Sequence, residues 1–275
     1  MTTVRLLERD QTAVVELANP PVNAWSDEFV EDLRSVLDTV AAGPYRSVVL
    51  VGEGKHFSAG GDFDRFQQVT DLESATSFLA NVCALIEQVA AMPMPVIAAI
   101  SGTALGGGLE LALACDIRVA APGATLGLPE ARWGLLAGAG GTQRLSRLVG
   151  PGRAKAMMFS AQPVDGVEAH RIGLVEVLAD GDDPLPAALE LAAQIAVNGP
   201  RSVRNIKRSV DEGIAHDLGT ALRLERELWL DLVPHGDLRE GIASFYDRRP
   251  PTYPDVAARD SRTDRTTPIA SGGTA

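Results

Sequence analysis

The chain has 275 residues, of which 45% are hydrophobic, and its formal net charge is −11. A chain of this length and composition buries a core of its own as one large domain and needs no disulfides. The acidic balance argues against a surface built to neutralise nucleic-acid phosphates.

The sequence predicts a soluble, cytoplasmic protein. Charges run through the first 17 residues, which lack the apolar stretch and small-residue cleavage site of a secretory signal. No segment approaches the ~18 uncharged apolar residues that a membrane span needs. The two cysteines, Cys83 and Cys115, lie in apolar stretches and are expected to be reduced thiols.

The first two-thirds of the chain alternate between strand-like and helical patterns, which predicts an α/β fold. Strands are expected at 13–17, 47–51, 96–100, 117–120 and 174–177. A helix is predicted after Ser26, its N-cap, and before Gly43-Pro44, which stop it. Its apolar stripe comprises Phe29, Val30, Leu33, Val36, Leu37 and Val40.

From about Pro186 the pattern changes to amphipathic helices alone. The expected packing positions there are Leu189, Leu191, Ile195, Ile206, Leu222, Leu228 and Leu232. The basic residues Arg201, Arg204, Lys207 and Arg208 recur at helical spacing, and we interpret them as a solvated helix face. We therefore divide the chain into a core with the active site (1–185), a helical region (186–250) and a largely disordered tail (251–275).

Two glycine-rich segments predict backbone donors. Residues 57–62, Phe-Ser-Ala-Gly-Gly-Asp, let the chain turn sharply and leave an N–H facing open space, although a plain strand-to-helix turn has the same composition. Residues 106–108 are three glycines before a short helix, whose first N–H groups have no partner within the helix.

Glu110 is the one polar residue in the otherwise apolar stretch 109–115. A helix apolar all round is buried, and a lone buried carboxylate needs a partner or a task. The partner would be an arginine such as Arg132. Burial raises the pKa of Glu110 and the helix N-terminus lowers it, and the sequence does not decide which effect wins.

A second acid, Glu130, follows twenty residues later and precedes a third glycine-rich segment, 138–141. That separation leaves room for a helix, a strand and a return, so the two carboxylates can meet across one pocket. Spacing alone is weak support, because the chain has 36 acidic residues.

The sequence does not match the motifs of other common types of site. Gly52-Glu53-Gly54-Lys55 lacks the spacing and hydroxyl residue of a phosphate-binding loop, and residues 102–107 do not form a dinucleotide fingerprint. The four histidines have no metal-ligand spacing, and no nucleophile elbow is present. We expect neither a metal nor a serine triad.

Together, residues 57–62, 95–100, 106–111, 129–130 and 138–145 closely resemble the crotonase (enoyl-CoA hydratase/isomerase) family, and the likeness continues through 169–175 and 239–245. The resemblance implies a spiral of ββα units with a C-terminal helical oligomerisation region, and assembly as a homotrimer or a dimer of trimers. It implies an oxyanion hole from the N–H groups of Gly61 and Gly107. It also implies that Glu110 and Glu130 are the acid/base pair.

The same resemblance implies the substrate contacts. Val22, Ala24 and Ala59 match parts of the family that contact CoA, while Trp229 and Arg248 stand where a neighbouring subunit often reaches the nucleotide. Asp64 stands where a lysine often meets a CoA phosphate, and adjacent Arg65 is expected to substitute for it. Trp133 is bulky and Ala137 replaces a common proline, which leaves the acyl-chain preference open.

The expected activity is enoyl-CoA hydration, in which CoA is part of the substrate and no further cofactor takes part. The presence of both glutamates favours a hydratase over a Δ3-Δ2 enoyl-CoA isomerase, for which Glu130 suffices. Thioester hydrolases and decarboxylases of the family stay open, and a dehalogenase is disfavoured because 131–147 holds no acid. A non-catalytic or RNA-binding relative is a further alternative, which the paired acids and the net charge disfavour.

Overall fold

A six-stranded sheet forms the centre of the molecule in this computed structural model, which describes residues 2–254. Its strands lie in the order β1 (Val4–Arg9), β2 (Thr12–Leu17), β4 (Ser47–Gly52), β6 (Val96–Ile100), β8 (Ile117–Ala120) and β11 (Val177–Leu178). β1 pairs with β2 antiparallel, and every later pairing is parallel. Four predicted strands are confirmed.

The fifth predicted strand, 174–177, lies too early in the chain. Leu174 donates its N–H to the carbonyl of Ala169 and, with Gly173 in the left-handed region, closes the end of α7 (Gly166–Arg171). Pairing with β8 begins only at Val177. The apolar residues are buried as expected, but they cap a helix instead of extending a strand.

Four main-sheet strands, β2, β4, β6 and β8, each lead into a short strand and then a helix, which is the spiral arrangement that the resemblance implies. β2 leads to β3 (Ala24–Trp25) and α1 (Asp27–Ala42), and β4 leads to β5 (Gly60–Gly61), α2 (Phe63–Phe66) and α3 (Leu72–Ala90). β6 leads to β7 (Thr103–Leu105) and α4 (Gly107–Ala114). β8 leads to β9 (Thr125–Gly127), a 3-10 turn η1 (Glu130–Trp133), α5 (Gly141–Val149) and α6 (Pro151–Ser160). The short strands pair separately, as β3–β5 and as β10 (Val164–Asp165)–β9–β7.

The sheet is buried on both faces, because its strands alternate side chains between two hydrophobic clusters. Val48 and Leu50 join the larger cluster with α1, α3 and α4, whereas Val49 and Ile97 join a smaller one with α8 (Leu185–Ala196). The predicted α1 is confirmed, with Ser26 as N-cap and Gly43 as C-cap. Since α8 packs on the sheet, the predicted boundary at 185/186 falls after the first residue of a helix of the core.

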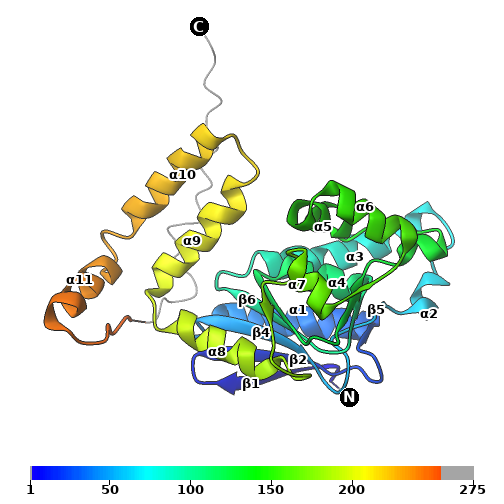
Figure 1. The fold of residues 1–275 in the computed structure, drawn as a ribbon, viewed down its shortest axis with the longest axis horizontal. Helices are drawn as coiled ribbons and strands as arrows, with labels where there is room; N and C mark the ends of the chain where they lie inside the picture. Colours follow the sequence, from blue (N-terminus) through cyan, green and yellow to red (C-terminus); the bar gives the residue numbers. More distant parts are fainter. Residues whose placement is uncertain (1, 255–275) are drawn as a thin grey trace, which may run out of the picture.

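The helices α9 (Pro200–Gly213), α10 (Leu218–Asp231) and α11 (Asp237–Asp247) form an arm that projects from the sheet (Figure 1). The interpretation of the α9 basic residues as a solvated face is wrong for Lys207, which is 9% exposed and pairs with Asp116 at 2.7 Å, and for Arg201, which pairs with Asp231. Ile206 and Leu222, predicted to pack, are exposed instead. The polar side of α9 faces the protein, and apolar residues face outward.

Within residues 2–254, no helix is long and apolar enough to cross a membrane. The predicted tail beyond Pro254 lies outside the described residues.

Candidate active site

Two glycine segments come together beside the carboxyl ends of β4 and β6. Gly60 has a φ of +85°, and a Cβ at this position would lie 2.6 Å from the carbonyl oxygen of Leu105 and 2.7 Å from the nitrogen of Gly107. A side chain would therefore collide with the backbone at the start of α4. This close approach brings Gly60, and with it the adjacent Gly61, near Gly107, the first residue of α4.

A buried polar network holds the first glycine segment in place. Asn23 donates to the carbonyls of His56 (2.8 Å) and Phe57 (3.2 Å). The indole N–H of Trp25 donates to the hydroxyl of Ser58 at 3.0 Å, and that hydroxyl donates to the carbonyl of Asn23 at 2.7 Å. Sequence reasoning did not assign this role to Asn23, Trp25 or Ser58. The sequence feature that could have indicated this network is the presence of an Asn and a Trp in a short segment between two strands.

The predicted residues Val22, Ala24 and Ala59 lie beside the same segment. Ala59 donates its N–H to the carbonyl of Val22 at 2.9 Å, and Ala24 pairs with Gly60 between β3 and β5. The structure therefore brings these three positions together with Gly61.

Glu110 is buried, with 5% of its surface exposed, and its Oε1 accepts N–H bonds from Ala139 (2.8 Å) and Gly141 (2.9 Å). Its partners are thus backbone groups of the third glycine segment, whereas Arg132, the arginine considered as a partner, is exposed. Burial raises the pKa of Glu110, and the two N–H bonds act against that rise. Burial wins.

Glu130 begins η1, and its carboxylate has fewer hydrogen-bond partners than that of Glu110. Its Oε2 is buried and has no hydrogen-bond partner among the described residues. Burial, with a smaller contribution from the charge of Glu110, raises the pKa of Glu130 to about 7. A Cβ at Gly106 would lie 3.3 Å from Oε1 of Glu130, so this carboxylate stands against the turn that begins α4.

The arrangement combines two kinds of group that acyl-transfer and addition chemistry need. Backbone N–H groups at the start of a helix such as α4 can stabilise an oxyanion, and the helix dipole acts in the same direction. Two carboxylates lie beside the start of α4. Glu110 accepts two backbone N–H bonds, whereas Oε2 of Glu130 has no hydrogen-bond partner among the described residues. Such a pair can act as base and acid in one reaction.

Comparison with known proteins agrees with this geometry. The enoyl-CoA hydratase/isomerase family model matches residues 8–256. The chain belongs to this family. YngF of Bacillus subtilis (strain 168), whose name places it in the same hydratase/isomerase group, is 41% identical over 256 residues, covering 91% of this chain and 97% of that protein.

Two further members of the family show the range of the likeness. The mitochondrial methylglutaconyl-CoA hydratase of Homo sapiens is 37% identical, with 91% of this chain and 76% of that protein covered. The crystal structure of an enoyl-CoA hydratase from Bacillus anthracis superposes with a TM-score of 0.87 at 36% identity, covering 91% of this chain and 98% of that one. The family fold is therefore shared over nearly the whole chain.

The remaining predicted substrate contacts are spread over the structure. The guanidinium of Arg65 forms an ion pair with Asp27 and lies 4.9 Å from the centre of the Phe78 ring. Trp133 ends η1, three residues after Glu130. Trp229 lies on α10 and Arg248 follows α11, so both belong to the arm and not to the neighbourhood of the two glutamates within one chain (Figure 1).

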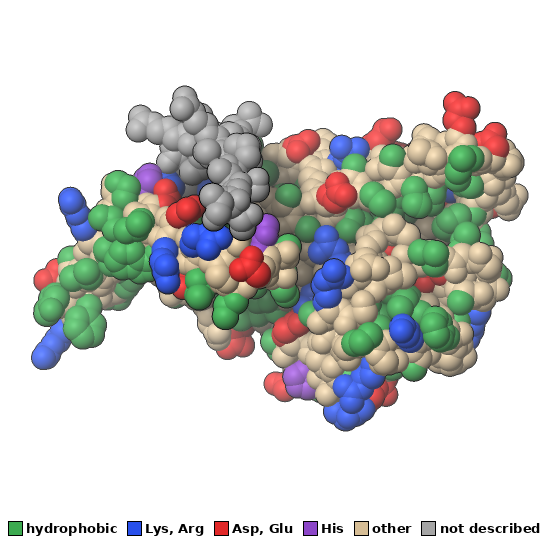
Figure 2. Space-filling model, turned by 90° about the horizontal axis from the view of Figure 1, so that it is seen from above, with side chains coloured by type: hydrophobic (Ala, Val, Ile, Leu, Met, Phe, Trp, Pro, Cys, Tyr) green, Lys and Arg blue, Asp and Glu red, His purple; other side chains and the backbone are tan. Residues whose placement is uncertain are grey.

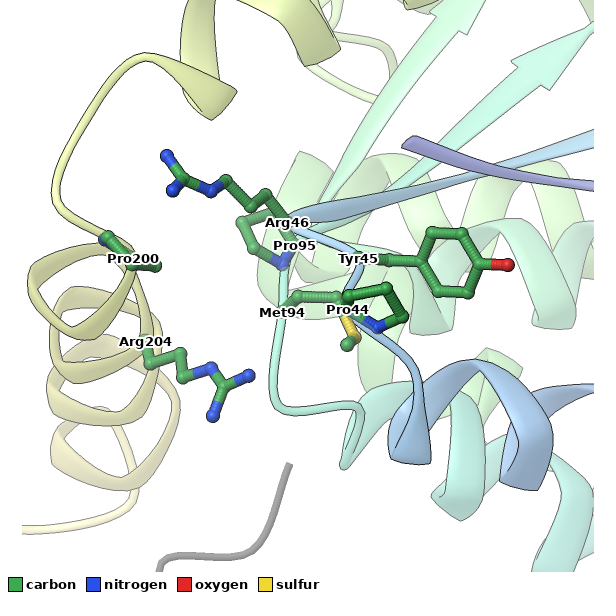
Figure 3. Close-up of a pocket in the computed structure, with 7 residues that line it drawn as sticks. All are labelled: Pro44, Tyr45, Arg46, Met94, Pro95, Pro200 and Arg204. Carbon is green, nitrogen blue, oxygen red and sulfur yellow. The ribbon is translucent and has the colours of Figure 1, made fainter. Parts of the chain in front are cut away.

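A separate concavity lies at the opposite edge of the sheet, where β4 and β6 begin and α9 starts. In Figure 3 the guanidinium groups of its two arginines point in different directions, and Arg46 binds the carbonyls of Ala196 and Tyr253. Burial, together with Arg201, lowers the pKa of Arg204. We interpret this concavity as the joint between arm and core, lined by Pro44, Tyr45, Arg46, Met94, Pro95, Pro200 and Arg204.

Proposed function

We propose that this protein is an enoyl-CoA hydratase, which adds water across the 2,3 double bond of a 2-enoyl-CoA. The observation that carries the proposal is the pair of carboxylates, Glu110 and Glu130, beside the N–H groups of Gly61 and Gly107. When water adds to the β-carbon, negative charge develops on the thioester oxygen, and two preorganised donors stabilise that enolate.

The two carboxylates take different roles because their surroundings differ. Glu110 accepts two N–H bonds, which oppose the rise in its pKa that burial causes, so it is assigned as the base that receives a proton from the attacking water. Glu130 has an oxygen without a partner and a pKa raised to about 7, so it holds a proton near neutral pH. It delivers this proton to the α-carbon as the enolate collapses.

Substrate binding uses the segments around the donors. Val22, Ala24 and Ala59 are proposed to contact CoA, which is part of the substrate, and no further cofactor is needed. Because Arg65 is engaged by Asp27, a phosphate contact from this residue requires it to exchange partners. Trp229 and Arg248 are proposed to reach the nucleotide of a neighbouring copy, in a homotrimer or a dimer of trimers. We propose a cytoplasmic site of action, with which the unpaired thiols of Cys83 and Cys115 are compatible.

The decisive assay follows loss of the conjugated enoyl-thioester absorbance when the enzyme is mixed with crotonyl-CoA. Wild type is compared with Glu110→Gln and Glu130→Gln, which keep the size of each side chain but remove its acid/base function. We expect each variant to lose at least about 10²-fold in kcat, which is the usual contribution of a positioned acid or base.

The same variants separate hydratase from isomerase, the alternative within the family. A 3-enoyl-CoA substrate reports isomerisation, for which one carboxylate suffices. If wild type forms no hydrated product, and Glu110→Gln keeps full isomerase activity while Glu130→Gln loses it, the protein is an isomerase. If both variants hydrate crotonyl-CoA at the wild-type rate, the carboxylate pair is not the catalytic machinery.

A further inference from the structure

Two aromatic residues join the opposite sides of the candidate active site. Phe63 begins α2, two residues after the donor Gly61, and Trp133 ends η1, three residues after Glu130. Their rings lie edge to face, with centroids 5.0 Å apart and an interplanar angle of 76°. This is a favourable geometry for an aromatic pair, and it links segments that are 70 residues apart in the chain.

The aromatic contacts continue from this pair inward to the oxyanion donor. Phe66 contacts Phe63 and Phe78, at ring-centroid distances of 6.1 and 5.1 Å. A Cβ at Gly61 would lie 2.9 Å from the ring of Phe66, so this ring borders the donor directly. The aromatic wall therefore begins where the thioester oxygen would bind and ends at the Phe63–Trp133 pair.

On the Glu110 side the wall is also largely apolar. A Cβ at Gly138 would lie 3.2 Å from the side chain of Leu79 on α3, and the thiol of Cys83 donates to the carbonyl of Gly138. Gly138 precedes the Ala139–Gly141 segment that holds Glu110. A chain leaving the reacting carbons between these two sides would meet hydrocarbon and ring surface.

Both rings of the pair are more than half exposed, 55% for Phe63 and 59% for Trp133. Large aromatic surface left in water beside a reaction centre is unfavourable, and an apolar ligand that covers it gains the corresponding burial free energy. The structure already supplies ring contact from both sides of the site, so an acyl group between them would be held by both.

We infer that Phe63 and Trp133 form a specificity-determining clasp, which selects apolar acyl groups longer or broader than four carbons. This inference rests on the proposed function, because it assigns the acyl group of the same CoA thioester. The chemical class is a medium-chain or aryl-substituted 2-enoyl-CoA. The pair acts by covering the acyl tail and takes no part in proton transfer.

The test compares crotonyl-CoA, trans-2-decenoyl-CoA and cinnamoyl-CoA as substrates of wild type, Phe63→Ala, Trp133→Ala and the double variant. We expect kcat/KM for the two larger substrates to fall about tenfold in each single variant, since removing a ring uncovers roughly two methylenes' worth of acyl surface. The fall in kcat/KM for crotonyl-CoA should be at least threefold smaller than the fall for the two larger substrates. Trp133→Phe, which keeps a ring, should restore most of the loss.

Tyr246→Ala is the control, because Tyr246 is also an exposed aromatic residue, at 79%, but lies on α11 in the arm. It should leave the ratio of the three kcat/KM values unchanged. Equal losses for crotonyl-CoA and decenoyl-CoA in Trp133→Ala, or no loss for either, would overturn the clasp.

A binding measurement separates failure of the clasp from failure of the proposed function. Calorimetric titration with the saturated esters butyryl-CoA and decanoyl-CoA needs no turnover. If wild type hydrates nothing but binds decanoyl-CoA at least tenfold more tightly than butyryl-CoA, and Trp133→Ala removes that difference, the clasp stands and the hydratase proposal fails. If the difference is absent in wild type, the clasp is wrong whatever the activity.

Discussion

The buried Oε2 atom of Glu130 gives this carboxylate an unusual proton affinity. Burial, with a smaller contribution from the charge of Glu110, raises the pKa of Glu130 to about 7, and no donor bonds to Oε2 to oppose this rise. Glu110 is more deeply buried but receives two N–H bonds. Burial raises the pKa of both residues, and the two N–H bonds oppose that rise at Glu110.

The raised pKa of Glu130 predicts how hydration depends on pH. If Glu130 donates the proton to the α-carbon, its protonated form is the active one, and that form is lost as pH rises through about 7. The rate constant kcat/KM for hydration should fall about tenfold per pH unit above this value. A pH profile from 5.5 to 9 with crotonyl-CoA measures it, and a profile that rises across this range would assign the base role to Glu130.

The same residue predicts a pH-dependent stability. Because the pKa of Glu130 in the folded protein lies above the ordinary value of 4.5, the folded state holds its proton more tightly than the unfolded chain does. Its contribution to stability is full below about pH 4.5 and is lost as pH rises to about 7. Glu130→Gln removes the buried charge, so its Tm should exceed that of wild type by several degrees at pH 8 and by little at pH 5.

Glu190→Gln provides the control for that comparison, since Glu190 is exposed on α8. Its Tm should follow wild type at both pH values. Thermal unfolding at pH 5 and pH 8 measures all three proteins, and a Glu130→Gln variant that is less stable than wild type at pH 8 contradicts the buried-charge explanation.

At the scale of the element, close backbone contact between the glycine segments is proposed to position the donors Gly61 and Gly107. Gly60→Ala forces a Cβ to within 2.7 Å of both Leu105 O and Gly107 N, in a left-handed conformation. We expect kcat to fall by ~10²–10³, the usual loss when one oxyanion donor is displaced. Crotonyl-CoA hydration measures the loss.

Gly54→Ala separates backbone strain from that collision. Gly54 has a similar φ of +80°, but no atom lies within 4 Å of its added Cβ. This variant should lose about 1 kcal/mol of stability from the left-handed conformation and keep the wild-type kcat. If both glycine variants reduce kcat equally, the close approach of Gly60 to α4 is not what positions the donors.

Sequence patterns predicted those elements in which local chemistry and burial agree. Four of the five predicted strands and α1, with its cap at Ser26, are confirmed because alternating or helical apolar periodicity coincides with two-sided burial. Leu174 and Val175 are equally apolar but close the end of α7, and only the register with β8 reveals where β11 begins. Pairing register is a tertiary property that no local window contains.

The candidate site also has parts that the sequence predicted and parts that it did not. Composition alone indicated the glycine turns and the isolated acid at Glu110. The partners of that acid, the N–H groups of Ala139 and Gly141, lie 29 and 31 residues away and depend on how the loop folds back. The network of Asn23, Trp25 and Ser58 was equally hidden, because each side chain gains its meaning from a contact more than thirty residues away.

At the scale of the whole molecule, the arm presents apolar surface that the chain itself does not cover. Ile206 and Val210 on α9 and Ile214 at its C-cap recur every four residues and are 61%, 61% and 75% exposed. Figure 2 shows hydrophobic side chains gathered on the arm's surface. The basic side of the same helix is turned inward, where Lys207 pairs with Asp116. A helix that turns its charges inward and its apolar stripe outward is suited to packing against another copy.

Charge on this stripe should therefore separate the copies. Ile206→Glu and Val210→Glu place a carboxylate where the proposed trimer buries hydrocarbon, a change that costs several kcal/mol unless the charge is paired. We expect light scattering after size exclusion to give a trimer or hexamer mass for wild type and a single-chain mass for the variants. Val197→Glu is the matched control, because Val197 is 65% exposed but lies off the stripe.

Separation of the copies should also raise the KM for crotonyl-CoA if Trp229 and Arg248 reach the nucleotide of a neighbouring copy. The effect on kcat should be smaller, since Glu110 and Glu130 lie within one chain. Variants that retain the wild-type mass would show that α9 is not the contact. Variants that separate but keep the wild-type KM would confine the arm to assembly and remove Trp229 and Arg248 from the substrate site.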